Sequence, residues 1–176
     1  MTTVEYLSRP ETVLPQELAF GVLHVRESPS PMHQRTVAQL FLALHAHLQA
    51  RGTGEVWLAP LDVILDEPRG LVVQPDLFVV VGGTTCVVGD RVWGPPDLTI
   101  EVLSPMSRVG DIQARIQWFA TYGVRECWLV HQIERAIEVI EFGGGVIRDR
   151  RWHPRAMPVR SSVLPNFRGS LDSMDA

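Results

Sequence analysis

The sequence predicts one α/β or α+β domain in which a mixed central β-sheet is flanked by helices and carries extra β-hairpins. A length of 176 residues suits a single compact domain, and no linker, repeat or low-complexity tract divides the chain. Two segments with helical spacing of apolar residues are separated by groups of short, β-branched apolar segments. The order helix, strands, helix and further strands is typical of a sheet covered by helices.

Two helices are predicted from the spacing of apolar residues. In residues 32–52, apolar side chains recur at steps of three and four, and Gly52 supplies a stop. In residues 111–123, Ile112, Ile116 and Phe119 share one helical face, and Gly123 is the expected C-cap.

Short apolar segments bounded by glycine and proline are predicted to be strands. Residues 1–16 are polar and interrupted by proline, which predicts an arm or loop. The three glycines at 143–145 are expected to form a hairpin turn. The predicted strands lie at 18–25, around 56–65, and at 72–81, 98–103, 127–132, 136–142 and 146–152.

Composition limits the possible functions. All 16 basic side chains besides histidine are arginine, so no lysine can take part in catalysis. The net charge of −4 means that a nucleic acid would have to meet a local basic surface. Cys86 and Cys127 are isolated, which favours a reducing, cytoplasmic setting. Neither a signal peptide nor a membrane span is predicted, because no window approaches about 18 uninterrupted apolar residues.

Two carboxylates interrupt the apolar segments of the predicted sheet. Asp76 follows a proline at the start of QPDLFVV, and Glu101 lies in the middle of PPDLTIEVLSP. Strand alternation places Glu101 on the face opposite to Ile100 and Val102. A buried carboxylate is unfavourable unless a cation pairs with it, and oxygen ligands on adjacent strands suit Mg²⁺ or Mn²⁺. The alternative is that Asp76 caps a turn and Glu101 pairs with an arginine.

The order of three motifs resembles a known family. QPDLFVV, then PPDLTIEVLSP, then GDIQARIQWFATYGVRECWLV are similar to the Uma-two-type family of restriction endonucleases. The earlier stretches ELAFGVLHV and SPSPMHQRTVAQL also resemble this family, so the similarity extends over about residues 15–170. The resemblance implies one restriction-endonuclease-like domain of the P-D…(D/E)-x-K superfamily over residues 1–176. It also implies hydrolysis of phosphodiester bonds in DNA.

The resemblance further implies roles for particular residues. Asp76 and Glu101 would bind Mg²⁺ or Mn²⁺, with the backbone carbonyl of Val102 as an extra ligand. Glu17 would be a third acidic residue of the site, and His33 matches a family histidine that would contact the phosphate or substrate. A metal held in this way activates water and stabilises charge on the scissile phosphate.

The chain departs from the family pattern at the lysine. Leu103 stands two residues after Glu101, where the lysine usually lies, and Arg115 stands where the family tends to place a lysine in the following helix. An arginine can donate to a phosphate but cannot serve as a general base. Asp111, four residues before Arg115, either supports it across one helical turn or is a favourable acid near a helix N-terminus.

Other polar residues are weaker candidates. Gln113 lies near the same helix face and is a candidate substrate contact, with solvent exposure as the alternative. Asp97 lies roughly 13 Å from Glu101 along the strand, too far to share a metal, and is predicted to be a turn residue. His45 and His47 do not face one ligand, and no histidine pair has zinc spacing.

Five arginines gather near the predicted C-terminal hairpin, with Trp152 and His153 among them and only Asp149 opposing. They form either a surface that follows a phosphate backbone or a charged hairpin edge protected from strand pairing. They are Arg148, Arg150, Arg151, Arg155 and Arg160.

Three classes of function remain open. The first is a metal-dependent endodeoxyribonuclease; a homodimer is expected from the resemblance and from the geometry of cutting both strands. The second is a catalytically impaired relative that binds nucleic acid or a partner protein on the same scaffold, which the missing lysine supports. A purely structural, oligomeric domain is a third possibility.

Overall fold

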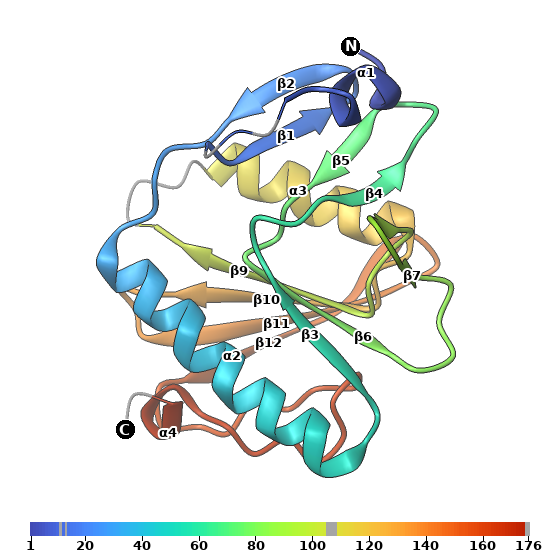
Figure 1. The fold of residues 1–176 in the computed structure, drawn as a ribbon. Coiled ribbons are helices and arrows are strands. Elements are labelled where there is room, and N and C mark those ends of the chain that lie inside the picture. Colours follow the sequence, from blue (N-terminus) through green and yellow to red (C-terminus); the bar gives the residue numbers. More distant parts are fainter. Residues whose placement is uncertain (11, 13, 105–108, 175–176) are drawn as a thin grey trace.

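The computed structural model describes residues 1–10, 12, 14–104 and 109–174, and strands in this part of the chain form two six-stranded sheets (Figure 1). The first sheet is ordered β2-β1-β5-β4-β8-β7, and the second β12-β11-β10-β9-β6-β3. In the second sheet β9 and β10 are parallel, whereas its other neighbours are antiparallel. The second sheet is therefore the mixed central sheet that the sequence predicts.

Two of the predicted strands are each interrupted, and the two parts of each belong to different sheets. The strand predicted around 56–65 breaks after Leu58 at Ala59 and Pro60, and the strand predicted at 72–81 breaks at Gln74 and Pro75. Proline has no N–H to donate to a ladder, so each break lets the chain pass from one sheet to the other. The first-sheet strands are β1 (Gln16–Ala19), β2 (Val22–Val25), β4 (Val63–Asp66), β5 (Leu71–Val73), β7 (Val87–Val88) and β8 (Val92–Trp93).

The second sheet contains the longer strands and carries the predicted C-terminal hairpin. Its turn falls at Gly144 and Gly145, which both have positive φ, as the three glycines predict. Its strands are β3 (Gly54–Leu58), β6 (Leu77–Val81), β9 (Leu98–Leu103), β10 (Glu126–His131), β11 (Ala136–Gly143) and β12 (Val146–Pro154).

Both predicted helices are present. In α2 (Pro31–Arg51) the side chain of Ser30 caps the N-terminus by accepting from His33 N, and Gly52 ends the helix at φ 61°. The second, α3 (Val109–Tyr122), is followed by Gly123 at φ 94°. Short helices lie near the ends, at α1 (Thr3–Leu7) and α4 (Leu171–Met174). None of the helices in the described ranges is long and apolar enough to span a membrane.

The N-terminal region differs from its prediction. Residues 3–7 form a helix rather than part of an arm, and the buried Tyr6 hydroxyl donates to Gln16 O at 2.8 Å and to Asp62 Oδ1 at 3.0 Å. The helix is too short to show an apolar period. The predicted strand at 18–25 is a hairpin that turns at Phe20 and Gly21, whose φ angles are 49° and 83°.

The two long helices cover opposite faces of the second sheet. Leu40 and Leu44 of α2 pack in the same cluster as Ile100, whereas Phe119 of α3 packs in the cluster that contains Leu103. The α3 cluster also includes residues of the first sheet, so α3 contacts both sheets. The predicted alternation along β9 is confirmed, and it places Glu101 on the α3 side.

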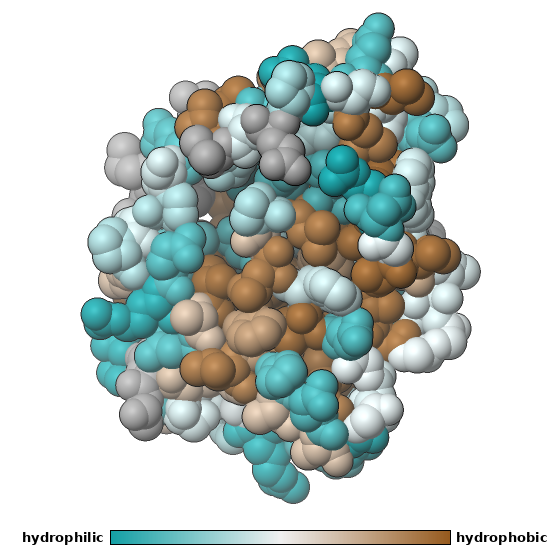
Figure 2. All heavy atoms as spheres, in the orientation of Figure 1, coloured by the Kyte–Doolittle hydropathy of each residue, from teal (hydrophilic) through white to brown (hydrophobic). Residues whose placement is uncertain are grey.

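One face of the molecule is notably apolar. Figure 2 shows brown side chains gathered across the middle of the face on which α2 crosses the sheet. Leu42 of α2 is 65% exposed, and Leu58 at the end of β3 is 38% exposed. Exposed apolar patches of this kind often mark interaction surfaces.

Candidate active site

Asp76 and Glu101 lie opposite each other at the junction between the two sheets. Leu77 of β6 is paired with Ile100 of β9, and continuing this antiparallel register by one residue sets Asp76 opposite Glu101. Pro75 precedes Asp76 at the passage from β5 to β6, so the break between the sheets brings the carboxylate to this place. The structure thus brings together the two carboxylates that the sequence singles out.

All hydrogen bonds between the Asp76 carboxylate and the described residues fall on one of its oxygens. Oδ2 accepts from Val102 N at 2.7 Å and lies 3.2 Å from His33 Nε2. This hydrogen bond, against the effect of burial, raises the pKa of His33. Oδ1 of Asp76 has no partner in the described part of the chain, and the side chain is 19% exposed. Asp76 is therefore fixed in orientation with one oxygen still available.

Glu101 is more deeply buried but also has one oxygen available. It is 6% exposed, and its Oε1 accepts from Arg115 Nε at 2.6 Å. Its Oε2 makes no hydrogen bond with any described residue. Burial raises the pKa of Glu101 to about 7, with Arg115 acting in the opposite direction and Asp76 adding to the rise.

Arg115 links Glu101 to Glu17. It is 5% exposed, and its Nη1 lies 2.8 Å from Oε1 of Glu17. Burial acts to lower the pKa of Arg115, but Glu101 and Glu17 raise it above its usual value. Nη2 is buried and has no partner among the described residues. Arg115 therefore stays charged and has one donor group left for a ligand.

Glu17, in β1, has its hydrogen bonds completed by protein groups. Besides Arg115, it accepts from Arg26 Nε at 2.9 Å and from Gln74 N. Burial opposes ionisation, but Arg115 and then Arg26 hold the pKa of Glu17 below its ordinary value. The predicted third acidic residue thus lies beside Arg115 and positions its guanidinium.

The prediction did not include Arg26 or Gln74. Glu17 lies opposite His24 in the β1–β2 hairpin, and Arg26 is two residues further on, on the same face. A hairpin assignment at Gly21 would have supplied this signal, whereas a continuous strand over 18–25 did not.

The predicted residues of α3 have different surroundings. Asp111 is exposed, and in the described part of the chain it has no ion-pair or hydrogen-bond partner, so the i,i+4 contact with Arg115 is wrong. Arg115 instead points to two strands. Asp111 remains an acid in the first turn of α3. Gln113 is exposed and lines a hollow of about 270 Å³. Leu103, two residues after Glu101, lines the same hollow.

Other candidates lie outside this cluster. Asp97 is buried at the start of β9, where it accepts from Val81 N at 2.8 Å and from Arg125 at 3.0 Å. This agrees with a structural role at the entry to the strand. His45 stacks on Phe41 and His47 meets Phe167 edge to face, which agrees with packing.

The arginines near the C-terminal hairpin are largely paired with acids. Arg150 contacts Glu138, Arg151 contacts Glu141, and Arg155 contacts Asp172. Pairing removes much of the positive field that a phosphate backbone would meet. Of the two interpretations, the charged hairpin edge describes this surface better.

The acidic pair suits a hard divalent cation. Oδ1 of Asp76 and Oε2 of Glu101 are carboxylate oxygens without partners in the described part of the chain, and the negative charge of Asp76 adds to the raised pKa of Glu101. In that part of the chain no group of three or more His, Cys, Asp or Glu side chains is arranged to hold an ion. Mg²⁺ commonly uses one or two carboxylates and completes its shell with water and substrate oxygens.

Comparison with known proteins supports this class of fold. A crystal structure from Anabaena variabilis ATCC 29413, described as "a putative nuclease belonging to DUF820", matches with a TM-score of 0.81 at 18% identity. The match covers 99% of this chain and 97% of that chain, so the mixed α+β fold is shared.

The chain belongs to the Uma2 family, which is described as "Putative restriction endonuclease". The family model matches residues 3–172, which confirms the resemblance seen in the motifs. A search of curated proteins found no match.

Proposed function

We propose that this protein is a metal-dependent endonuclease that hydrolyses phosphodiester bonds in DNA, with its active site at Asp76 and Glu101. The observation that carries the proposal is the pair of opposed carboxylates beside a buried arginine, each with one oxygen that no described residue hydrogen-bonds. Family membership supports nuclease chemistry.

The residues of the site have separate roles in this proposal. Asp76 and Glu101 would hold Mg²⁺ or Mn²⁺, which when bound activates water and stabilises charge on the phosphate; the Val102 carbonyl is a further candidate ligand. His33 and Val102 N keep Asp76 in place through Oδ2. Arg115 holds Glu101 by Nε and Glu17 by Nη1, and directs Nη2 toward a phosphate oxygen.

A second function is favoured by the state of Arg115. Two carboxylates hold its guanidinium and keep it protonated, so Arg115 has no free lone pair with which to act as a general base. A chain in which Arg115 replaces the lysine would then bind nucleic acid, or a partner protein, at the same site without turning it over. The two functions share the metal site and differ in cleavage.

Metal titration tests the shared site. We expect wild type to bind Mn²⁺ in calorimetric titration and Glu101→Gln to lose at least about tenfold in affinity, because a ligand oxygen is replaced. Glu141→Gln is the matched control, since Glu141 also pairs with an arginine on the second sheet but lies away from Asp76. Equal Mn²⁺ affinity for wild type and Glu101→Gln would remove the metal site.

Plasmid cleavage separates the two functions. An endonuclease nicks or linearises supercoiled DNA in Mg²⁺ or Mn²⁺, stops in chelator, and loses activity with Glu101→Gln but not with Glu141→Gln. If only Arg115→Lys cleaves, the natural chain is a binding protein derived from a nuclease.

We propose that two copies of the chain pair to act on both strands of a duplex. The support is the apolar face on which α2 crosses the sheet, together with the need for two sites in a double-strand cut. Leu42 of α2 is itself 65% exposed. Sedimentation equilibrium of wild type and Leu42→Glu measures this; a monomeric wild type at micromolar concentration rules it out.

A further inference from the structure

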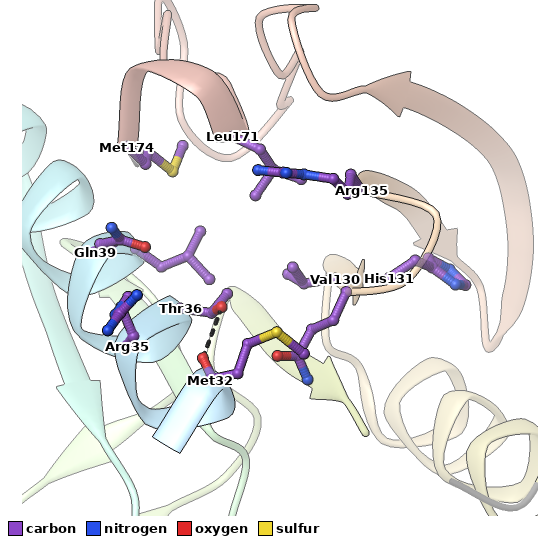
Figure 3. Close-up of a pocket in the computed structure, with 11 residues that line it drawn as sticks. Met32, Arg35, Thr36, Gln39, Val130, His131, Arg135, Leu171 and Met174 are labelled. Carbon is purple, nitrogen blue, oxygen red and sulfur yellow. Dashed lines mark hydrogen bonds between the residues drawn. The ribbon is translucent and has the colours of Figure 1, made fainter. Parts of the chain in front are cut away.

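A second hollow lies beside the acidic site, between α2, the end of β10 and α4 (Figure 3). Its volume is about 370 Å³, which is near the lower end of the range for small-ligand pockets. We call it the α2–β10 pocket. Leu40, Val130, Leu171 and Met174 supply its apolar lining.

The α2–β10 pocket adjoins the proposed active site through two short connections. Met32 lines the pocket, and the next residue, His33, contacts Asp76. Gln132 also lines the pocket, and its Nε2 donates to Leu103 O at 2.8 Å, two residues after Glu101. The pocket, on the α2 side of the sheet, is therefore lined by residues that adjoin or contact the immediate neighbours of the acidic pair.

The polar groups of the pocket are suited to an anion with a polar planar ring. Arg35 of α2 and Arg135 of the β10–β11 turn enter from opposite walls, and Arg35 has no ion-pair partner in the described part of the chain (Figure 3). Guanidinium groups on two walls attract phosphate.

Two carboxamides add hydrogen-bonding groups of both kinds. Because Gln132 Nε2 is held by Leu103 O, its Oε1 is an acceptor of known orientation, and this oxygen is buried without a partner in the described residues. Gln39 lies on the opposite wall, on α2. A nucleobase presents edges that donors and acceptors of this type bind, while its faces pack on apolar side chains.

We propose that the α2–β10 pocket receives one unpaired nucleotide of the DNA strand that crosses the acidic site. The proposal rests on the proposed function for its substrate class. The base packs on the apolar lining between Gln39 and Gln132, and its phosphate lies between Arg35 and Arg135. The preferred substrate then has a single-stranded segment or a base turned out of the duplex next to the scissile phosphate.

Binding without divalent metal tests the pocket independently of cleavage. Fluorescence anisotropy compares a single-stranded oligonucleotide with the same oligonucleotide carrying abasic positions, both in EDTA. Wild type is expected to bind the base-bearing strand at least about fivefold more tightly, since a base gains affinity by stacking on the pocket lining and an abasic position does not. Gln39→Trp fills the pocket and abolishes this preference. Arg35→Gln weakens both complexes, whereas Arg51→Gln, an exposed arginine at the other end of α2, leaves them unchanged.

The outcomes separate this proposal from its alternatives. Equal affinity of wild type for base-bearing and abasic strands overturns it, as does a base preference that survives Gln39→Trp. If deoxynucleoside monophosphates bind in calorimetry but Gln39→Trp leaves oligonucleotide affinity unchanged, the pocket serves a free nucleotide and the proposal is wrong. A protein that shows the base preference but never cleaves supports the pocket while contradicting the nuclease function.

Discussion

Glu101 and Glu126 are buried carboxylates on the paired parallel strands β9 and β10, but their surroundings differ. Glu126 is fully buried and accepts from Trp128 Nε1 at 2.7 Å, from Ser162 N at 2.8 Å, and from the hydroxyls of Ser161 and Ser162. Glu101 accepts from Arg115 alone and keeps one oxygen free of hydrogen bonds among the described residues.

The difference shows that burial of a carboxylate does not by itself mark a functional site. Glu126 is surrounded by neutral donors that satisfy both oxygens, and these donors tie residues 161–162 of the C-terminal segment to the sheet. Glu101 lies beside a second carboxylate and a charged arginine, one donor group of which has no partner among the described residues. Incomplete hydrogen bonding next to a like charge is the feature that indicates ligand chemistry.

The largest effect on stability is expected for Arg115→Met. This change leaves Glu101 and Glu17 buried without their shared cation and should lower the free energy of unfolding by about 3–5 kcal/mol. Urea unfolding followed by circular dichroism measures the loss, with Arg125→Met, at a half-exposed arginine paired with Asp97, as the control. A loss below that of the control would mean that Arg115 does not balance the two carboxylates.

Glu126→Gln should affect stability more than Mn²⁺ affinity, whereas Glu101→Gln should affect Mn²⁺ affinity more than stability. The new amide directs an N–H₂ group at donors that Glu126 now accepts from, so we expect a loss of about 2 kcal/mol in unfolding free energy with unchanged Mn²⁺ affinity. Glu101→Gln should lose Mn²⁺ affinity with a smaller change in stability. The comparison fails if Glu126→Gln impairs Mn²⁺ binding in folded protein as strongly as Glu101→Gln does.

The sequence singles out Glu101 but not Glu126. Strand alternation and the Pro-Asp dipeptides at the start of apolar segments single out Asp76 and Glu101, since both signals are local. Helical spacing likewise located α3, and the family resemblance then pointed to Arg115. The sequence gives no signal for Glu126, because three of its four donors belong to residues 35 and 36 positions later, in a segment with no period.

The ion-pair partners of Arg115 cannot be predicted from local sequence patterns, for a similar reason. Asp111 was the nearest acid in sequence, but Arg115 extends from α3 to β9 and β1, and Glu17 is 98 residues away. Only the separation of the first sheet from the second brings Glu17 to this place. That separation depends on the breaks at Pro60 and Pro75, which the strands predicted at 56–65 and 72–81 do not include.

Ser162→Ala sharpens the comparison by removing one of the four donors of Glu126. The backbone N–H of residue 162 still donates, so the expected loss is about 1 kcal/mol in unfolding free energy, roughly the net contribution of one hydrogen bond. Ser104 is not a suitable control because it adjoins the acidic site, whereas Ser8→Ala removes a hydroxyl from an exposed turn. Equal effects of Ser162→Ala and Ser8→Ala would show that Glu126 does not depend on its hydroxyl donors.

The smallest effect is expected for His153, which tests whether incomplete hydrogen bonding has the same meaning away from a second charge. Nε2 of His153 accepts from Arg160 N at 3.2 Å, while Nδ1 is buried without a partner among the described residues. Burial lowers the pKa of His153 below its ordinary 6.5, so the unfolded chain binds the proton more readily. Its contribution to stability is present above pH 6.5 and is lost as the pH falls below it. His153→Gln, which keeps an acceptor but does not titrate, should show a shallower decline of unfolding free energy between pH 7 and 5 than wild type, with unchanged Mn²⁺ affinity. Identical pH profiles for the two proteins would mean that His153 is as easily protonated in the fold as in the unfolded chain.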